Sequence, residues 1–336
     1  MIDRDTFGDK EAQEQFTASV DVIIPVYKPD IKFKHLVERL VRQSIKPNRI
    51  ILLHTVEEIS DKSNPDDVEK TEDELAYVMS FSTADCRIER YEIKKPEFDH
   101  GGTRNYGATL SQADIILFIT QDAVPADVNL IRSLIQPFKE PGVAAVYGRQ
   151  LAAQKSSVIE SYTRQFNYPD KSYTKSLSDL PRLGIKTYFC SNVCAAYRKS
   201  VYDNLGGFVT KTIFNEDMIM AAGIIHAGYS IAYSAQAKVY HSHVYSCLQQ
   251  FKRNFDLAVS QKQYDHIFSS VKSEDEGIKL VKQTLDYLIK SKQYKRIPDL
   301  ILQSGFKYLG YKAGKNYELF PKNLVKKLSM NSSYWN

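Results

Sequence analysis

The chain has 336 residues, of which 43% are hydrophobic and 25% are charged, so its composition is that of an ordinary globular protein. Its net charge of +5 is too small to indicate a nucleic-acid-binding protein. The charge is uneven, because residues 245–336 hold 16 basic and 8 acidic residues while the rest is slightly acidic. Four cysteines are too few for a disulfide scaffold, and the charged N-terminus predicts no signal peptide. No apolar run approaches the ~20 residues of a membrane-spanning helix, so we expect a cytoplasmic protein.

Strands and helices alternate through the first 150 residues. The pattern predicts strands at 20–26, 50–53, 87–93, 115–120 and 143–147, and helices at 33–41, 103–113 and 128–138, with a polar loop leading into a helix at 57–74. This alternation predicts a parallel, Rossmann-like α/β sheet. Ligands of such sheets bind at the carboxyl ends of the strands, so the residues after Val26, Leu53 and Thr120 are the first candidates for a site. Neither common glycine-rich phosphate motif is present.

The second half predicts a helix at 218–227, extended segments at 230–234 and 239–245, and a helical pattern from residue 248 onward.

The first candidate site is the run FDHGGTRNYG at residues 98–107. Gly101 and Gly102 are expected to open a helix with Arg104 and Asn105 in its first turn. Free N–H groups at a helix start favour a phosphate, and Arg104 adds a cation. The alternative is that the glycines serve turn geometry alone, with Asp99 or Thr103 as the cap.

Two further patterns suggest a metal site. Asp122 directly follows the most apolar predicted strand, where a carboxylate is well placed to hold a divalent cation. The alternative is a turn into the Pro125 loop. His241 and His243 lie two residues apart on an extended segment and should share a face, where they could bind metal or phosphate. Two exposed histidines are an equally good interpretation.

The last candidate is the pair Glu216-Asp217. Asn215 is expected to cap the following helix, which places both carboxylates in its first turn. They could simply compensate the helix dipole. Alternatively, one of them is a general base that removes a proton from a hydroxyl group.

In order and spacing, these motifs together resemble family 2 glycosyltransferases over residues 20–245. The runs FDHGGTRNYGA and FITQDAVP are similar to the bacterial rhamnosyltransferases that build cell-surface polysaccharides from dTDP-L-rhamnose. The resemblance implies a GT-A fold, with a Rossmann-like, mostly parallel sheet flanked by helices and a C-terminal helical extension. It divides the chain into a lead-in at 1–18, a catalytic domain at 19–245 and a basic helical region at 246–336.

The resemblance also implies a role for each candidate residue. Asp217 would be the catalytic base beside Glu216, and Asp122 would bind Mg²⁺ or Mn²⁺ together with His241 or His243. The residues expected to bind the donor are Pro25, Tyr27, His100, Gly101, Gly102, Arg104, Asn105 and Gln121. Two departures stand out: the family's aspartate at the end of the second strand is missing, so Thr55 or Glu57 would replace it, and the metal motif is reduced to Asp122 alone.

The implied reaction is inverting transfer of a sugar from a nucleotide-sugar donor to a polysaccharide or a lipid-linked saccharide, with no nucleic acid involved. A homo-oligomer is compatible with the sequence. Lysines alternate with aromatic and aliphatic residues between Tyr308 and Leu328, which suits peripheral contact with an anionic membrane at the inner face of the cell membrane. The alternative is a helix packed on the catalytic domain with its lysines in solvent. Two other functions stay open: a non-catalytic nucleotide-binding module, and a metal-dependent hydrolase built on Asp122, His241 and His243.

Overall fold

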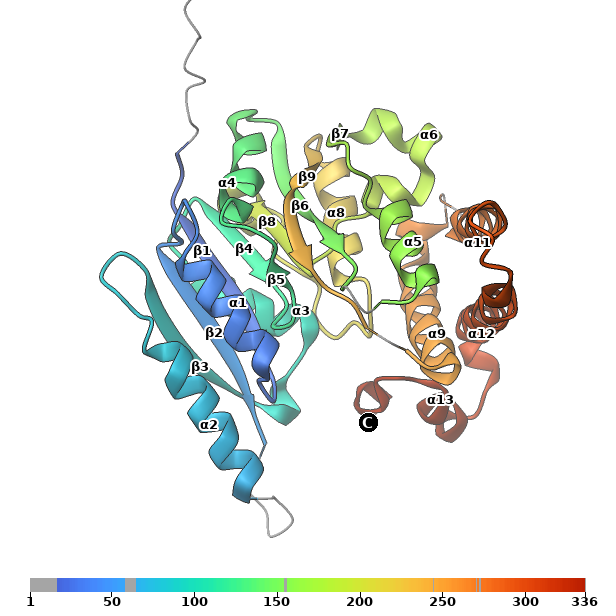
Figure 1. Ribbon diagram of the computed structural model, residues 1–336, viewed down its shortest axis with the longest axis horizontal. Coiled ribbons are helices and arrows are strands. Elements are labelled where there is room, and N and C mark those ends of the chain that lie inside the picture. The colour runs from blue at the N-terminus through green and yellow to red at the C-terminus, as the bar shows by residue number, and fades with distance from the viewer. Residues whose placement is uncertain are drawn as a thin grey trace, which may run out of the picture.

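The computed structural model of the protein describes residues 17–57, 65–153, 156–243, 245–269, 271 and 273–335, so nearly all of the predicted lead-in lies outside the described residues. A nine-stranded sheet forms its centre (Figure 1). The strands are β1 Val20–Val26, β2 Arg49–Val56, β3 Arg87–Lys94, β4 Ile115–Ile119, β5 Val124–Pro125, β6 Val143–Leu151, β7 Tyr173–Lys175, β8 Cys194–Arg198 and β9 Ser230–Tyr240. Eight of them follow the order β3-β2-β1-β4-β8-β6-β9-β5, and β7 pairs with β9.

Helices cover both faces of this sheet. They are α1 Ile31–Val41, α2 Pro65–Met79, α3 His100–Leu110, α4 Leu130–Ile135, α5 Val158–Asn167, α6 Leu180–Leu183, α7 Lys199–Asn204 and α8 Glu216–His226. Helices α1, α2 and α4 contribute to the hydrophobic core on one face, and α3, α7 and α8 to the core on the other. Figure 1 shows α1 and α2 side by side in front of the strands.

The N-terminal half of the sheet is the parallel α/β unit that the sequence predicts. Strands β3, β2, β1 and β4 run parallel, and β8 then pairs antiparallel with β4. Helix α1 forms because apolar residues recur every three or four positions, and Asp30 caps it by accepting the Lys32 and Phe33 N–H groups. The predicted fold class, an α/β sheet of GT-A type with C-terminal helices, is confirmed.

Two local predictions are wrong in their bounds. The helix expected after the polar loop at 57–74 is present as α2, but it begins at Pro65, within the predicted loop. Leu75 and Val78 pack it on the sheet despite its many acidic residues. The two extended segments predicted at 230–234 and 239–245 form one strand, β9, which ends at Tyr240. A register shift between Gly148 and Arg149 of β6 leaves the stretch 235–237 of β9 without paired residues, and beyond this bulge the strand continues to Tyr240.

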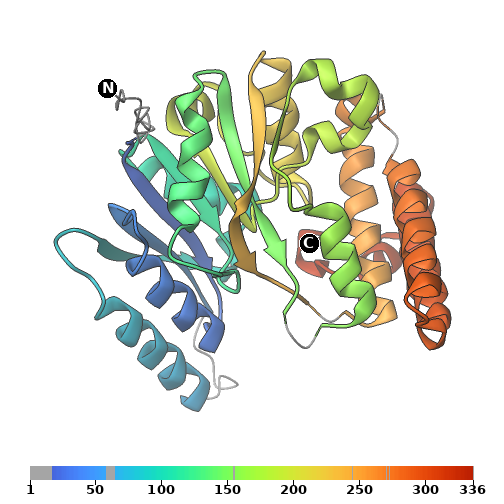
Figure 2. The same ribbon diagram turned by 45° about the horizontal axis from the view of Figure 1, so that its top comes forward.

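Further helices follow the sheet: α9 Cys247–Gln263, α10 Asp265–Phe268, α11 Ser273–Lys290, α12 Ile297–Lys315 and α13 Lys322–Leu328. Figure 2 shows most of this extension, coloured orange to red, against one side of the body. Helices α9 and α12 pack closely, since a Cβ on Gly310 or Gly314 would lie 2.2 Å from the carbonyl oxygen of Phe251 or Phe255. None of the described helices is long and apolar enough to cross a bilayer.

Candidate functional site

The loops after β1 and β4 are joined by the Gln121 side chain. The Tyr27 N–H donates to Gln121 Oε1 at 2.7 Å, and Gln121 Nε2 donates to the Tyr27 carbonyl oxygen at 2.9 Å. Both residues follow the carboxyl ends of neighbouring parallel strands, where a ligand site was expected. Gln121 therefore fixes the backbone of Tyr27 and stands directly before Asp122.

A charged cluster surrounds the exposed ring of Tyr27. Its hydroxyl donates to Glu57, and Lys95 Nζ binds both Glu57 and the Tyr27 hydroxyl. The hydrogen bond from Lys95, followed by that from Tyr27, lowers the pKa of Glu57 to about 2, so this carboxylate stays ionised. Thr55 is buried, and its hydroxyl has no hydrogen-bond partner among the described residues. Pro25 lies within β1, opposite Leu53 of β2.

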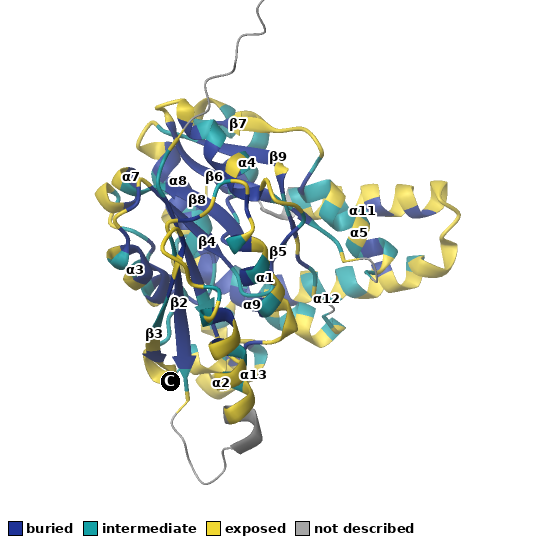
Figure 3. Cartoon of the chain, turned by 60° about the vertical axis from the view of Figure 1, so that its left-hand side comes forward, coloured by how far each residue is buried: buried dark blue, intermediate teal, exposed yellow. Residues whose placement is uncertain are grey.

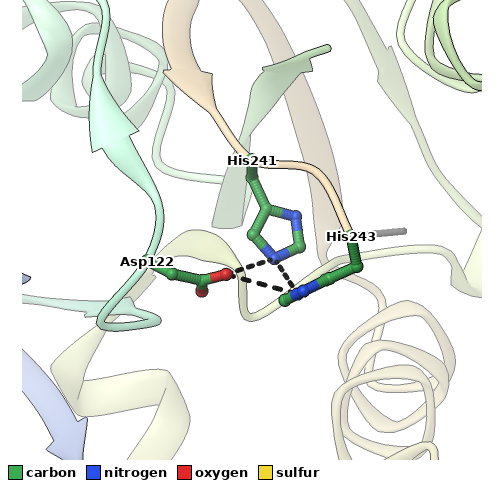
Figure 4. A group of neighbouring side chains, drawn as sticks. All are labelled: Asp122, His241 and His243. Carbon is green, nitrogen blue, oxygen red and sulfur yellow. Dashed lines mark hydrogen bonds and ion pairs between the residues drawn. The ribbon is translucent and has the colours of Figure 1, made fainter. Parts of the chain in front are cut away.

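Asp122, His241 and His243 converge on one point (Figure 4). The Asp122 Oδ2 atom lies 3.6 Å from His241 Nε2 and 3.3 Å from His243 Nε2, and the two Nε2 atoms are 3.0 Å apart. The short strand β5 causes this convergence, because Val124 pairs antiparallel with Tyr240. The same register, continued outward, places Asp122 between the two histidines, which lie beyond the end of β9 and not on an extended strand as predicted. We call these three residues the triad.

The tautomer of His241 is set by Gln150 of β6. The Gln150 Oε1 atom lies 3.0 Å from His241 Nδ1, so Nδ1–H donates to it and Nε2 keeps its lone pair. Burial lowers the pKa of His241 to about 2, and burial also lowers the pKa of His243. Both imidazoles are therefore neutral near pH 7, the state in which histidine binds a metal ion.

Replacing Gln150 should weaken metal binding without touching a ligand atom. Gln150→Leu removes the acceptor that orients His241, and loss of such a partner typically costs about 10- to 100-fold in metal affinity. Titration of Mn²⁺, followed by electron paramagnetic resonance, measures this. Gln150→Glu keeps an acceptor for Nδ1 and should retain most of the affinity. Equal affinities for Gln150→Leu and the wild type would argue against this role.

Asp217 lies in the first turn of α8 and is largely enclosed. Its carboxylate accepts the Asn192 N–H at 3.3 Å and the Met218 N–H at 2.8 Å. Burial, with a smaller contribution from Glu216, raises its pKa to about 7. Asn215 takes the predicted N-cap position, but its side chain makes no capping hydrogen bond: the residue adopts a left-handed conformation with φ of 65°, and its amide donates to the Leu257 carbonyl oxygen of α9.

Glu216 is paired with Arg104 of α3, at 3.5 Å. The Arg104 guanidinium is buried and also donates to the His100 carbonyl oxygen at 2.8 Å. Its nearest described partners are thus a carboxylate and a backbone carbonyl. Burial lowers the pKa of His100, which faces the same cluster of charges.

The start of α3 differs from the open phosphate cradle expected at the two glycines. The helix begins at His100, and Asp99 caps it by accepting the Gly102 N–H. Gly101 packs so tightly on Val209 that a Cβ would lie 2.0 Å from its carbonyl oxygen. Of the two predicted caps, Asp99 is confirmed, and the Gly102 N–H is not free for a phosphate.

Asn105 fastens the turn around residues 206–208. Its amide nitrogen donates to the Phe208 carbonyl oxygen, and its oxygen accepts the Phe208 N–H, each at 2.8 Å. The Tyr202 hydroxyl also donates to this oxygen, at 2.5 Å.

A short chain of contacts connects the triad with Asp217. Gln150, the partner of His241, donates through Nε2 to the Ser191 hydroxyl at 3.1 Å. The next residue, Asn192, donates its N–H to Asp217. The potential metal site and the carboxylate with the raised pKa thus border one region at the carboxyl ends of the strands.

Comparison with known families shows which family the chain belongs to. The family model described as glycosyl transferase family 2 matches residues 21–206, more than half of the chain. The chain belongs to glycosyl transferase family 2. The glycosyltransferase is 37% identical over 324 residues to the O-antigen chain rhamnosyltransferase RfbN of Salmonella typhimurium, covering 94% of this chain and 96% of that protein. It is 36% identical to the O-antigen chain rhamnosyltransferase WbaN of Salmonella anatum, covering 95% and 96%.

A solved structure shares the fold of the glycosyltransferase. The mannosyltransferase PcManGT from Pyrobaculum calidifontis, determined with GDP-Man and Mn²⁺, superposes with a TM-score of 0.52 at 12% identity. The match covers 95% of this chain and 85% of that one. At this identity the likeness shows the fold alone.

Two cations near the candidate site were not singled out in the sequence. Lys95 follows the end of β3, so the strand-end rule could have found it. Arg253 lies on α9, exposed, with its guanidinium 4.8 Å from the centre of the Phe214 ring, and its charge lowers the pKa of His100, His241 and His243. Nothing in the sequence distinguishes it from a solvated residue of a helix.

Proposed function

We propose that the protein is an inverting rhamnosyltransferase. It would move L-rhamnose from dTDP-L-rhamnose to a hydroxyl group of a saccharide or lipid-linked saccharide, in the synthesis of a bacterial cell-surface polysaccharide. The main support is that one edge of the sheet holds two features. One is the metal-ligand triad, and the other is the Asp217 carboxylate, whose pKa of about 7 suits a general base. Two O-antigen rhamnosyltransferases at 37% and 36% identity over nearly the whole chain support the sugar assignment.

The donor nucleotide would lie along the loops after β1, β2 and β4. The exposed Tyr27 ring offers a surface on which a pyrimidine can stack, and the ionised Glu57 offers an acceptor for a base N–H. Glu57 is the better substitute for the family's missing aspartate, since Thr55 is buried. Arg253 would bind the diphosphate, because it is exposed and lies among the site's histidines. Arg104 would instead stabilise Glu216, to which it is paired.

The triad fits a divalent cation. Octahedral ligands at ~2.1 Å lie about 3.0 Å apart on one face, and the three atom pairs are separated by 3.0 to 3.6 Å. Imidazole nitrogen is a ligand of transition metals, so we expect Mn²⁺ to bind more tightly than Mg²⁺. Such an ion, held by Asp122, His241 and His243, would neutralise charge on the leaving diphosphate.

Asp217 would act on the acceptor. With a pKa of about 7, Asp217 is ionised in about half of the protein molecules near pH 7. An ionised Asp217 can take the proton of an attacking hydroxyl group. The backbone N–H groups of Asn192 and Met218 hold both of its oxygens, so the carboxylate is fixed before the acceptor arrives. Glu216 would position the pair through its contact with Arg104. We place Asp217, Glu216 and the triad in a catalytic domain at 19–245, followed by a helical region at 246–336 that contributes Arg253.

A panel of nucleotide sugars tests the donor. Thermal unfolding is measured with Mn²⁺ and, in turn, dTDP-L-rhamnose, dTDP-glucose, UDP-glucose and GDP-mannose. A ligand at about 100 times its dissociation constant adds about 2.7 kcal/mol of stability, a shift of several degrees. We expect the largest shift with dTDP-L-rhamnose, reduced by Glu57→Gln. A larger shift with a UDP or GDP sugar would contradict the proposed donor.

A further inference from the structure

The end of α11, the start of α12 and the turn between them form an exposed arm, defined here as residues 285–302. Figure 3 shows α11 and α12 reaching out from the body, with mostly exposed residues at their tip. Because Gly310 packs on Phe251 and Gly314 on Phe255, α12 and α9 run parallel. The first turns of α12 therefore extend beyond Cys247, where α9 begins.

Large apolar side chains on this arm face solvent. Ile301 is 66% exposed, Tyr294 57% and Leu302 54%, and Ile289 is also exposed. Single exposed apolar residues are common on protein surfaces, whereas several on one projection indicate contact with a partner or a lipid surface. The basic stretch between Tyr308 and Leu328 is divided. Val325 is buried in a cluster with Phe255 and Val259, whereas Tyr308 and Leu319 are exposed. Peripheral contact through this stretch therefore stays a prediction.

The arm is also basic. It has four basic residues, Lys290, Lys292, Lys295 and Arg296, and two acidic ones, Asp286 and Asp299. The two acids pair with Lys290 and Arg296, while Lys292 and Lys295 form no ion pair with a described residue. Pairing of two copies through this arm would bring two such basic sets together and is disfavoured. An anionic surface complements both the apolar and the basic side chains.

The arm is firmly attached to the site region through α5. Ile159 packs with Leu288 and Leu300, and the Tyr162 ring stacks on Tyr287 with 4.5 Å between centres. The same helix contributes Arg164, which donates to Gln150, the partner of His241. A surface bound by the arm would thus lie on the side of the molecule that α5 shares with the triad.

We propose that the arm docks the protein on an anionic lipid bilayer, inserting Tyr294, Ile301 and Leu302 among the headgroups while Lys292 and Lys295 meet lipid phosphates. The docking itself is independent of the sugar transferred. The consequence of docking rests on the proposed function. Docking would hold the site close to the bilayer, as an acceptor embedded in the membrane requires.

Flotation with vesicles tests the proposal on the full chain, without donor or acceptor. We expect binding to vesicles of phosphatidylethanolamine and phosphatidylglycerol, and little binding to phosphatidylcholine alone. At about a fivefold loss per cationic contact, Lys292→Glu with Lys295→Glu should weaken binding at least about thirtyfold. Ile301→Ser with Leu302→Ser should also weaken it. The matched controls are Lys139→Glu with Lys171→Glu, and Val128→Ser with Leu177→Ser, all exposed residues outside the arm.

Equal binding by the arm variants and their controls, or no binding to anionic vesicles by the wild type, would overturn the proposal. Sedimentation velocity without vesicles tests whether a second copy of the chain binds the arm instead. Self-association of the wild type that the arm variants abolish would show that the arm is a contact between copies and would overturn the proposal. The thermal shift with dTDP-L-rhamnose should be the same in all of these proteins. The docking proposal can therefore fail while the proposed function stands, and the proposed function can fail while the docking proposal stands.

Discussion

Asp217→Asn should lose sugar transfer by about 10²- to 10⁴-fold while still binding the donor, because a general base contributes about that much to the rate. The amide is nearly the same size as the carboxylate and keeps an oxygen for the Met218 N–H, but it cannot accept a proton. Initial rates of dTDP release with acceptor present, and donor affinity by calorimetry, measure the two effects separately.

The pH dependence gives an independent check on this role. The base must be ionised, and the pKa of Asp217 is raised to about 7, so kcat/KM of the wild type should fall about tenfold for each pH unit below 7 and level off above 8. The residual activity of Asp217→Asn should lack this slope.

Asp256→Asn is the matched control for Asp217→Asn. Asp256 is another buried aspartate with a raised pKa, and its carboxylate accepts the Met330 and Asn331 N–H groups at 2.9 and 3.1 Å. We expect its substitution to leave the transfer rate unchanged. If Asp217→Asn lost donor binding together with activity, Asp217 would have a structural role and our assignment would be wrong.

Asp122→Ala should make the affinity for the donor independent of the metal ion. Removal of one of three ligands should lower Mn²⁺ affinity by more than about hundredfold, since loss of a mere supporting partner already costs 10- to 100-fold. For the wild type, EDTA should weaken the binding of dTDP-L-rhamnose. For Asp122→Ala, donor affinity should be low and unaffected by EDTA, as measured by calorimetry with and without the chelator.

Asp127→Ala is the control for Asp122→Ala. Asp127 lies five residues further along the chain, after β5, where its carboxylate accepts the Asn129 N–H at 2.8 Å, and its loss should not change metal binding. If the donor affinity of the Asp122→Ala protein still fell on addition of EDTA, the metal would be bound elsewhere.

The strand-end positions were predictable because parallel strands place their carboxyl ends together whatever the details of the chain. Tyr27, Glu57 and Gln121 follow three such strands, and the structure brings all three into contact. The family resemblance implied that Asp122 and one of the two histidines share a metal site, and the structure brings both histidines to Asp122. Local patterns could not predict this convergence, because it depends on β5, a two-residue strand too short to produce any periodic pattern in the sequence.

Other features depend on tertiary contacts that local patterns do not contain. Asn215 follows the usual sequence preference for a helix cap, yet a partner on α9, the Leu257 carbonyl oxygen, takes its amide. Arg104 resembles a phosphate ligand in sequence, but α8 places Glu216 beside it. The exposed arm could not be predicted either, because the packing of α12 on α9 and of the arm on α5 determines which of its apolar residues are left in solvent.

The central claim is inverting transfer of rhamnose, and nuclear magnetic resonance of the reaction in progress tests it most directly. The protein is mixed with Mn²⁺, dTDP-L-rhamnose and a saccharide acceptor, and the anomeric proton of the first product is observed. We predict a rhamnoside with the anomeric configuration opposite to that of the donor, formed in step with dTDP and only when acceptor is present. Retained configuration, or release of free rhamnose at the same rate without acceptor, would contradict it.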